Sequence, residues 1–455
     1  MITKQKGTYD LRDERAKEFN ILRSFIDDFM DKYNYSYIET PVFESSSLFH
    51  RGVGETTDIV TKETYDFTDR GKRKITLRPE GTAGIVRSYI ENKDYANAIK
   101  KYYYLSRMYR YERPQSGRFR EFFQFGCELI GSGDPISDAE LISVPVTFLK
   151  VLGLKNIKVN LNSLGNAASR EVYKKELIKY IKPNIDKLCE DCKERLEKNP
   201  LRILDCKVDS GSEVLKNVPK TIDYLDDESK KHFDSVCKYL DALQIDYIIN
   251  TNIVRGLDYY THTVFEIEAE VDGKQSVICA GGRYDNLINE LGGPSMPAIG
   301  FAFGIERLLD ALKAEGIDLY KDSGIDVFVA PVSDNEKEFA LALTTSLRML
   351  GIKTELDLLS KNIKGNFKQA ENYGSKLIII IGEDEIKNNY LTVKNLTTKE
   401  ELKVKNEDLI TFIDSTLSGS DMHECDCSCG CHEGEECTCG DDCNCGENCT
   451  CHRDK

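Results

Sequence analysis

The sequence lacks any long run of apolar residues. The longest, LIIII at 377–381, has the length of one β-strand, whereas a membrane-spanning helix needs roughly 18 or more such residues. The first residues, MITKQKGTYDLRDERAKEF, carry acidic side chains and no apolar core of the kind that a secretory signal needs. We therefore expect a cytoplasmic protein without a membrane segment.

An excess of positive charge is also absent. The formal net charge is −15, which argues against a nonspecific binder of polyanions. The negative charge is unevenly distributed, because residues 421–455 contain ten Asp and Glu but only two Lys and Arg. That segment carries −8, so residues 1–420 carry only −7, and a basic groove for nucleic acid remains compatible with the composition.

The first 320 residues are dominated by patterns of β-strands, with a few helices. Residues 13–33 space apolar side chains as an amphipathic helix does. Later stretches alternate as antiparallel strands do, including KYYYLSRMYRYE, FREFFQFGCELIG, NIKVNLNSL, YTHTVFEIEAEV and QSVICAGG. This mixture predicts an α+β domain over residues 1–320, with an antiparallel sheet flanked by helices, rather than a doubly wound fold.

The pattern changes at three places along the chain. Between about 166 and 240 it becomes helical and rich in lysine, which predicts an inserted helical subdomain. Residues 325–417 follow the order β-α-β-α-β of a small, separate α/β domain. The last segment, residues 421–455, has low complexity and is rich in cysteine, so it needs a separate account.

Four arginines lie among six aromatic residues in MYRYERPQSGRFREFFQFG at 108–126. If 103–112 and 118–130 are two strands joined by PQSG, the two-residue period of strand side chains places one set on a shared face. That set is Arg118, Arg120, Phe122, Gln124 and Glu128, with Arg110 and Glu112 opposite across the hairpin. A surface hairpin with its charges in water is the alternative, but the aromatic neighbours predict burial, where charge must be paired or bound to a ligand. Because a guanidinium matches phosphate oxygens, the hairpin fits a nucleotide-phosphate clamp.

Two other stretches place charge in apolar surroundings. TNIVRGLDYYTHTVFEIE puts Arg255 and Asp258 just before an aromatic strand, and AIGFAFGIERLLDAL puts Arg307 on an apolar strand-turn-helix. A salt bridge alone could hold Arg307 in a core helix. Three arginine-bearing segments of this kind are harder to explain as separate salt bridges than as parts of one anion site.

Five motifs together resemble histidyl-tRNA synthetase, a class II aminoacyl-tRNA synthetase: RYERPQSGRFREFFQFGCE, TLRPEGTAG, VRGLDYYTHTVFE, AGGRYDNL and AIGFAFGIERL. The resemblance covers about residues 1–417. It implies the class II antiparallel sheet flanked by helices, the helical insertion at about 166–240 and a C-terminal α/β anticodon-binding domain at 325–417.

The resemblance implies an ATP-dependent, AMP-forming histidine–tRNA ligase. Histidine would attack the α-phosphate of ATP to give histidyl-adenylate, and the histidyl group would pass to the 3′ end of tRNA(His). By similarity, Arg110 and Arg255 hold the α-phosphate and are the catalytic candidates, and Arg118 and Arg307 hold the β and γ phosphates. Glu112 would seat the adenine side, and Mg²⁺ would bridge the phosphates. Such chemistry depends mainly on positioning and electrostatic stabilisation.

The same resemblance implies a histidine-binding set: Glu80, Thr82, Gln124, Glu128, Arg255, Tyr260 and Tyr284. Glu128 and Gln124 can accept from and donate to the two distinct nitrogens of an imidazole ring. Glu80 and Thr82 would receive the α-ammonium group, while capping of the following helix is the alternative role of Glu80.

Further partners follow from the resemblance. Gln115 lies where the family meets the end of the acceptor stem, although an exposed turn residue is an equal alternative. Lys361, Lys364 and Lys368 form a basic strip that could contact the anticodon stem or simply face solvent. The segment YIETPVFE resembles the dimer interface of the family, so we expect a homodimer. A non-catalytic, histidine-sensing regulatory subunit is the alternative function.

The insertion contains LCEDC at 188–192 and a single cysteine at 206. A zinc site normally needs four ligands, and three cysteines give no closed set unless Cys237, His232 or an acid joins them. The sequence leaves metal binding here open, with plain structure as the alternative.

The cysteine-rich tail has almost no apolar residue and cannot form a core. It resembles metallothionein in composition and spacing, and disulfides rarely persist in the cytosol. We predict that it binds Zn²⁺ or Cu(I), with a disordered acidic extension as the alternative. The candidate ligands are Cys425, Cys427, Cys429, Cys431, Cys437, Cys439, Cys443, Cys445, Cys449 and Cys451.

Overall fold

The computed structural model describes residues 1–418 apart from 54–58, 97–98, 115–116, 207, 254–258 and 272. The chain divides into two compact units, Met1–Tyr320 and Lys321–Lys455, which are described separately. Within the described residues, no helix combines the length and apolar character needed to cross a membrane.

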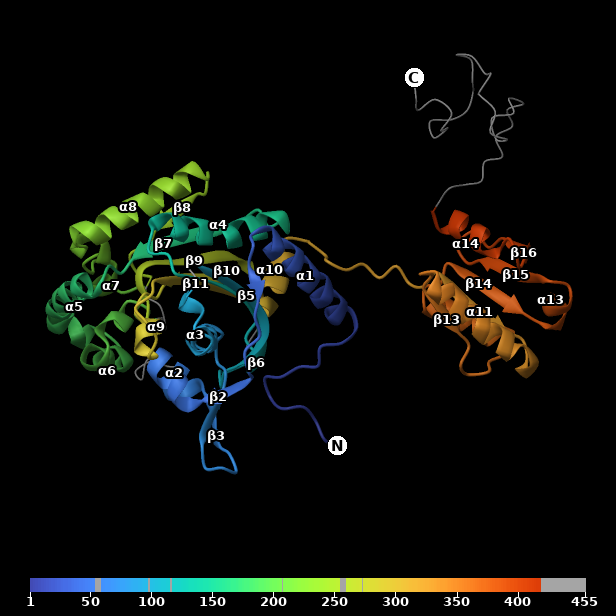
Figure 1. The fold of residues 1–455 in the computed structure, drawn as a ribbon, viewed down its shortest axis with the longest axis horizontal. Helices are drawn as coiled ribbons and strands as arrows, with labels where there is room; N and C mark the ends of the chain where they lie inside the picture. The colour runs from blue at the N-terminus through green and yellow to red at the C-terminus, as the bar shows by residue number, and fades with distance from the viewer. Residues whose placement is uncertain are drawn as a thin grey trace, which may run out of the picture. The chain divides into compact units, whose positions relative to one another are not determined.

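An eight-stranded sheet organises the first unit (Figure 1). Its inner strands are antiparallel, whereas the two edge pairs, β1 with β5 and β7 with β8, are parallel. This sheet fits the predicted α+β class. In spatial order the strands are β1 (Ser36–Tyr37), β5 (Lys100–Tyr109), β6 (Glu121–Ile130), β11 (Ala298–Gly304), β10 (Lys274–Arg283), β9 (Thr261–Val271), β7 (Lys158–Ser163) and β8 (Tyr247–Ile249).

The main core lies between one face of this sheet and a layer of helices. These helices are α1 (Asp13–Lys32), α4 (Pro135–Val151), α8 (Asp227–Ala242) and α10 (Ile305–Ala314), and Figure 1 shows them along one side of the sheet. Phe125 of β6 stacks on Phe303 of β11 at 5.7 Å between ring centroids, and both rings contact Phe148 of α4. The odd-numbered residues of β6 therefore pack into this core, and its even-numbered residues point to the opposite face of the sheet.

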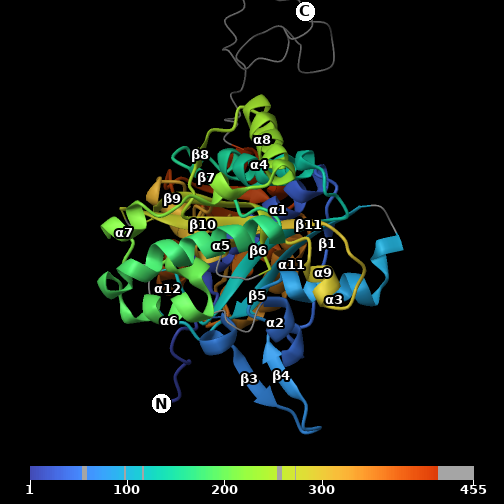
Figure 2. The same ribbon diagram turned by 90° about the vertical axis from the view of Figure 1, so that its left-hand side faces the viewer.

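A smaller sheet of three strands, β2 (Phe43–Ser45), β4 (Lys74–Leu77) and β3 (Tyr65–Thr68), stands beside α2 (Ser46–Val53) and α3 (Thr82–Glu91). The hairpin of β3 and β4 projects from the unit in both views (Figure 1 and Figure 2). The predicted strand SYIETPVFES is interrupted at Pro41, as its sequence indicates, and becomes the separate strands β1 and β2.

The helical stretch at 166–240 forms a second core. α5 (Ala167–Ile181), α6 (Glu190–Lys198) and α7 (Glu213–Lys216) pack with short 3₁₀ turns around buried Tyr173, Leu177 and Cys192. The last helix of the stretch, α8, packs against α4 instead and contributes Phe233 to the main core.

The second unit holds a five-stranded sheet in the order β13 (Thr354–Leu356), β12 (Val327–Pro331), β14 (Leu377–Ile381), β15 (Tyr390–Asn395) and β16 (Glu401–Lys405). The first three strands are parallel and the last two are antiparallel additions. Its helices are α11 (Lys337–Met349), α12 (Ile363–Asn372), α13 (Glu383–Lys387) and α14 (Leu409–Ser418). The β-α-β-α-β order read from the sequence accounts for β12 to β14 but leaves out β15 and β16, which are short and rich in polar residues.

Candidate active site

A cavity of about 470 Å³ opens over β6, β10 and β11 in the first unit. Small residues of these strands, Ala280, Gly300 and Ala302, line it and leave room above the sheet. Gly300 is required there, because a Cβ at this position would overlap a carboxylate oxygen of Glu128. The even-numbered residues of β6 face this side, so the predicted alternation of side chains is confirmed within β6.

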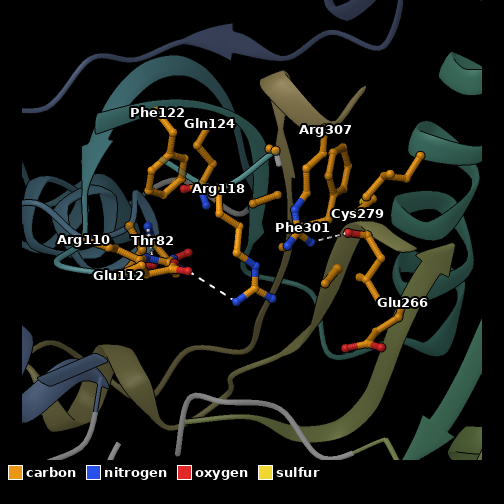
Figure 3. Close-up of a pocket in the computed structure, with 18 of the residues that line it drawn as sticks. Thr82, Arg110, Glu112, Arg118, Phe122, Gln124, Glu266, Cys279, Phe301 and Arg307 are labelled. Atoms are coloured by element: carbon orange, nitrogen blue, oxygen red, sulfur yellow. Dashed lines mark hydrogen bonds and ion pairs between the residues drawn. The ribbon is translucent and has the colours of Figure 1, made fainter. Parts of the chain in front are cut away.

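Three arginines surround one end of the cavity. Figure 3 shows Arg110 and Glu112 on one side and Arg307 on the other, with Arg118 between them. Arg110 donates from Nε to the carbonyl of Pro79 at 2.8 Å, and Arg307 donates to the carbonyl of Val277 at 2.7 Å. Backbone carbonyls therefore fix both guanidinium groups.

Glu112 is the anion that pairs with two of these arginines. Its two carboxylate oxygens lie 3.9 Å from Arg110 and 3.4 Å from Arg118. Burial lowers the pKa of Arg307, and the positive charges of Arg118 and Arg110 lower it further against the opposing effect of Glu112. The three guanidinium groups outnumber the carboxylates of Glu112 and Glu266 that line the same cavity, which favours a polyanion at this end.

A buried carboxyl group closes the other end. The Glu128 side chain is 1% exposed and accepts hydrogen bonds from the Thr82 hydroxyl at 2.7 Å and from the Tyr284 hydroxyl. Burial raises the pKa of Glu128 to about 8, and the nearby negative charge of Glu80 adds to the rise. Because this pKa lies near neutral pH, the carboxyl can exchange a proton with a bound group that also titrates near neutral pH.

Glu80 fulfils the helix-capping alternative. Its two carboxylate oxygens accept from the backbone amides of Thr82 at 2.9 Å and Ala83 at 2.7 Å, at the start of α3. It also lines the cavity, and burial raises its pKa. Capping therefore fixes the orientation of this carboxylate toward the cavity and does not remove it from the site.

Aromatic hydroxyls complete this end. Tyr104 donates to the Gln124 side-chain oxygen at 3.0 Å, which orients the Gln124 amide. Tyr259 packs between Tyr260 and Tyr284, with centroid distances of 4.7 and 5.7 Å. The Glu128 carboxyl lies beneath the cavity wall at this end. The wall itself is lined by Glu80, Thr82, Tyr104, Gln124, Tyr259, Tyr260 and Tyr284.

Arg120 is an exception to the predicted shared face. Its guanidinium stacks 3.9 Å from the Tyr111 ring centroid and its Nε donates to the Glu112 carbonyl at 3.2 Å, so it does not line the cavity. The physical reason is that β6 begins only at Glu121, and the two-residue alternation does not extend into the turn before it.

Several predicted residues lie outside the described part of the chain. They are Gln115, Arg255, Asp258 and all ten cysteines of the tail.

Some residues of the cavity were not predicted from the sequence. Arg202 and Asp205 reach it from the helical insertion, and Tyr104, Tyr259 and Glu266 reach it from the sheet side. The stretch PLRILDCK places Arg202 and Asp205 within an apolar run, the same pattern that drew attention to Arg307. That pattern could have identified them.

Comparisons with known proteins agree along almost the whole chain. The family model described as Histidyl-tRNA synthetase matches residues 7–308, and an anticodon binding domain matches residues 326–416. A Histidine–tRNA ligase of Streptococcus pneumoniae is 45% identical over 409 residues, which is 89% of this chain and 95% of that protein. One of Staphylococcus aureus is 46% identical over 417 residues, or 90% and 99%. The crystal structure of apo S. aureus histidyl-tRNA synthetase has a TM-score of 0.77 at 41% identity and covers 91% of this chain and 100% of that chain.

Proposed function

The chain belongs to the histidyl-tRNA synthetase family, and from this membership we propose that its cavity binds ATP at the arginine end and histidine at the Glu128 end. The chain is an aminoacyl-tRNA ligase that joins histidine to tRNA with ATP. One observation carries the allocation of residues. A single cavity combines a cationic end with a buried end of carboxyl and hydroxyl groups, as a triphosphate and an imidazole require.

At the cationic end, Arg110 holds the α-phosphate and Arg118 and Arg307 hold the β and γ phosphates. The like charges of these guanidinium groups repel one another, and a bound polyanion relieves that repulsion. Glu112 pairs with both Arg110 and Arg118 and seats the adenine side. Arg255, which lies outside the described residues, belongs to the proposal through the motif VRGLDYY and opposes Arg110 at the α-phosphate.

At the other end, Glu128 accepts from one imidazole nitrogen and Gln124 donates to the other. Thr82 and Tyr284 hold the Glu128 carboxyl in place, and Tyr104 fixes the Gln124 amide. Glu80 keeps unused lone pairs after its two backbone contacts and receives the α-ammonium group beside Thr82. Tyr260 and Tyr284 form the aromatic wall. An analogue without that ring N–H would leave Glu128 unpaired, which typically costs a factor of about 10⁴ to 10⁵ in selectivity.

The first step needs no general base, because the histidine carboxylate that attacks the α-phosphorus is already ionised at neutral pH. Arg110 and Arg255 would stabilise charge on the nonbridging oxygens, and the remaining arginines would align the pyrophosphate leaving group.

Mg²⁺ fits this donor set. Glu112 and Glu266 bring carboxylates into the same cavity as the proposed phosphates, and carboxylate and phosphate oxygens are the ligands that Mg²⁺ prefers. When bound, the ion supplies further neutralisation of phosphate charge.

The second unit supports tRNA(His) as the macromolecular partner. An anticodon binding domain matches residues 326–416, and Lys361, Lys364 and Lys368 are exposed at α12. We assign these lysines to phosphates of the anticodon stem, where contacts position the RNA without reading its sequence. Gln115 is assigned to the acceptor end on the family resemblance alone.

A homodimer through the segment YIETPVFE is part of the proposal. β1 is an edge strand, and Tyr37, Val42 and Phe43 are 42%, 39% and 59% exposed. Such a row of exposed apolar residues fits a partner surface. Sedimentation of the wild type should give a dimer, and Phe43→Asp should shift it toward monomer; a monomeric wild type would contradict this assignment.

The tail is proposed to bind soft metal ions separately from aminoacylation. Zinc titration of a peptide covering 421–455 should release protons as thiolates form, and an unchanged pH and spectrum would refute metal binding. A chain ending at Ser418 should aminoacylate at the full rate.

The decisive experiment is histidine-dependent exchange of labelled pyrophosphate into ATP without tRNA. Wild type should catalyse it, whereas Arg255→Ala and Arg110→Ala should lose at least a hundredfold. Arg113→Ala is the matched control, because Arg113 is an exposed arginine of the same turn. Equal losses in all three variants would contradict the allocation, and no exchange by folded, histidine-binding wild type would favour the histidine-sensing alternative.

A further inference from the structure

Three cysteines and an aspartate of the helical insertion converge on one point. The ligand atoms of Cys189, Cys192, Cys206 and Asp209 all lie within 4.8 Å of one another. Cys192 and Cys206 are 0% and 3% exposed, and Asp209 is 8% exposed. The acid that the sequence left unidentified is therefore supplied by Asp209.

Two of the distances between these ligand atoms are close to the edges of a tetrahedral metal site. With Zn–S of about 2.3 Å and Zn–O of about 2.1 Å, a regular tetrahedron has S–S edges of about 3.8 Å and S–O edges of about 3.6 Å. The Sγ atoms of Cys189 and Cys206 are 3.6 Å apart, and Cys206 Sγ lies 3.5 Å from an Asp209 oxygen. A disulfide would need about 2.05 Å between sulfurs, so the geometry favours a central ion.

The local fold holds the four donors in place. Cys189 precedes α6 and Cys192 lies in its first turn, where the Cys192 amide donates to the Cys189 carbonyl at 3.0 Å. The Cys189 amide in turn donates to the Asp209 carboxylate at 3.0 Å. The start of α6 is therefore in direct contact with Cys206 and Asp209.

The partners of Asp209 support a ligand role. Among the described residues, the groups that donate to its carboxylate all belong to cysteines. A buried carboxylate is costly without a cation, and a divalent metal supplies one. His232, one of the other candidates from sequence, faces the Asp138 carboxylate at 3.2 Å instead, and Cys237 packs at the main core.

We propose that Cys189, Cys192, Cys206 and Asp209 bind one structural Zn²⁺ that positions a wall of the catalytic cavity. Cys206 directly follows Asp205, and Arg202 lies in the preceding 3₁₀ turn; both of these residues line the cavity. The other end of this segment is tied to α6, because the Asn199 amide donates to the Arg195 carbonyl at 2.8 Å. Zinc attaches the Cys206 end of residues 199–206 to the start of α6, while the backbone attaches the Asn199 end to the last turn of that helix, and together they hold Arg202 and Asp205 at the cavity.

Crystals of the full-length chain, prepared with a reductant and zinc, locate the ion independently of the tail. Diffraction at the zinc absorption edge should give an anomalous peak at the centre of the four ligand atoms. Its absence, or density for a disulfide between Cys189 and Cys206, would overturn the proposal.

Native mass spectrometry of zinc-equilibrated full-length protein gives the second test. Cys192→Ser should carry one zinc fewer than wild type, while the matched control Cys237→Ser should carry the same number. Asp209→Ala should bind this zinc about 10-fold to 100-fold more weakly, and Asp209→Cys should restore it by completing a four-thiolate site. Equal zinc counts in Cys192→Ser and wild type would contradict the site. If Cys192→Ser misfolds, Asp209→Cys is the second test, because it should carry the same number of zinc ions as wild type.

The positioning role has its own measurement. Asp209→Ala without zinc should raise the KM for ATP or histidine severalfold, and Asp209→Cys with zinc should restore it. Zinc binding that leaves both KM values unchanged would refute the link to the cavity. Failure of the pyrophosphate exchange in wild type would instead concern the proposed catalytic function, since the zinc count and the anomalous peak need no activity.

Discussion

Replacing Glu128 by glutamine should make the empty protein more stable and catalytically inert. The carboxyl is fully buried, and its pKa is about 8 against an ordinary value of 4.5. Between these values the folded protein keeps a proton that the unfolded chain has released, so the free energy of unfolding falls as the pH rises. Glutamine is neutral throughout and keeps a similar shape, and Thr82 and Tyr284 carry hydroxyls that can both donate and accept.

The size of the effect follows from the two pKa values. The stability difference between Glu128→Gln and wild type should grow by about 3.5 kcal/mol from pH 5 to pH 8, in favour of the variant. With an unfolding entropy of about 2.1 cal/mol/K per residue, a unit such as Met1–Tyr320 should show this as roughly 5 °C in its unfolding temperature. Titrating groups that do not interact with Glu128 are common to both proteins and cancel in the comparison.

Scanning calorimetry of both proteins at pH 5 and pH 8 measures the difference. The chain has no tryptophan, so calorimetry is preferable to intrinsic fluorescence. Histidine-dependent pyrophosphate exchange by Glu128→Gln should be lost, while ATP binding remains. A stability difference that stays constant across this pH range would show that Glu128 titrates normally, and the account of the buried carboxyl would be wrong.

Three further substitutions test other parts of the structure. Gly300→Ala would push a Cβ into the Glu128 carboxylate, so the KM for histidine should rise at least tenfold in pyrophosphate exchange while ATP binding persists; an unchanged KM would contradict the close contact. Asp138→Asn should cost about 3–5 kcal/mol of unfolding free energy, because it removes the fully buried one of the two carboxylates that pair with Arg283 and leaves only the partly exposed Asp285; calorimetry showing wild-type stability would count against this. Arg307→Ala should raise the KM for ATP about 10-fold to 100-fold by removing a charge-assisted contact, and equal KM values would exclude Arg307 from phosphate binding.

Much of the fold could be predicted because local patterns matched the final environment. The amphipathic helix predicted at 13–33 appears as α1, and the alternating stretches KYYYLSRMYRYE and FREFFQFGCELIG appear as β5 and β6. β15 and β16 were not identified, because YLTVKN and ELKVK are short and contain few apolar residues, although both alternate.

The candidate site was predictable for a different reason. Charges at Arg110, Arg118, Arg307 and Glu128 are conspicuous in aromatic and apolar surroundings, and they do line or close one cavity. Contacts between segments that are far apart in the sequence could not be predicted from local residue patterns. The meeting of Asp209 with Cys189 depends on how the insertion folds back on itself, which spacing along the chain does not encode.

One face of strand β6 packs into the core and the other faces the cavity, and this restricts how the strand can change in evolution. Phe125, Cys127 and Leu129 pack into the main core, while Gln124 and Glu128 face the cavity. A library of all single substitutions should show alternating tolerance along the strand, with volume-conserving apolar changes accepted on one face and almost none on the other. A one-residue insertion or deletion would exchange the two faces, so lineages should vary this strand by substitution and never by length.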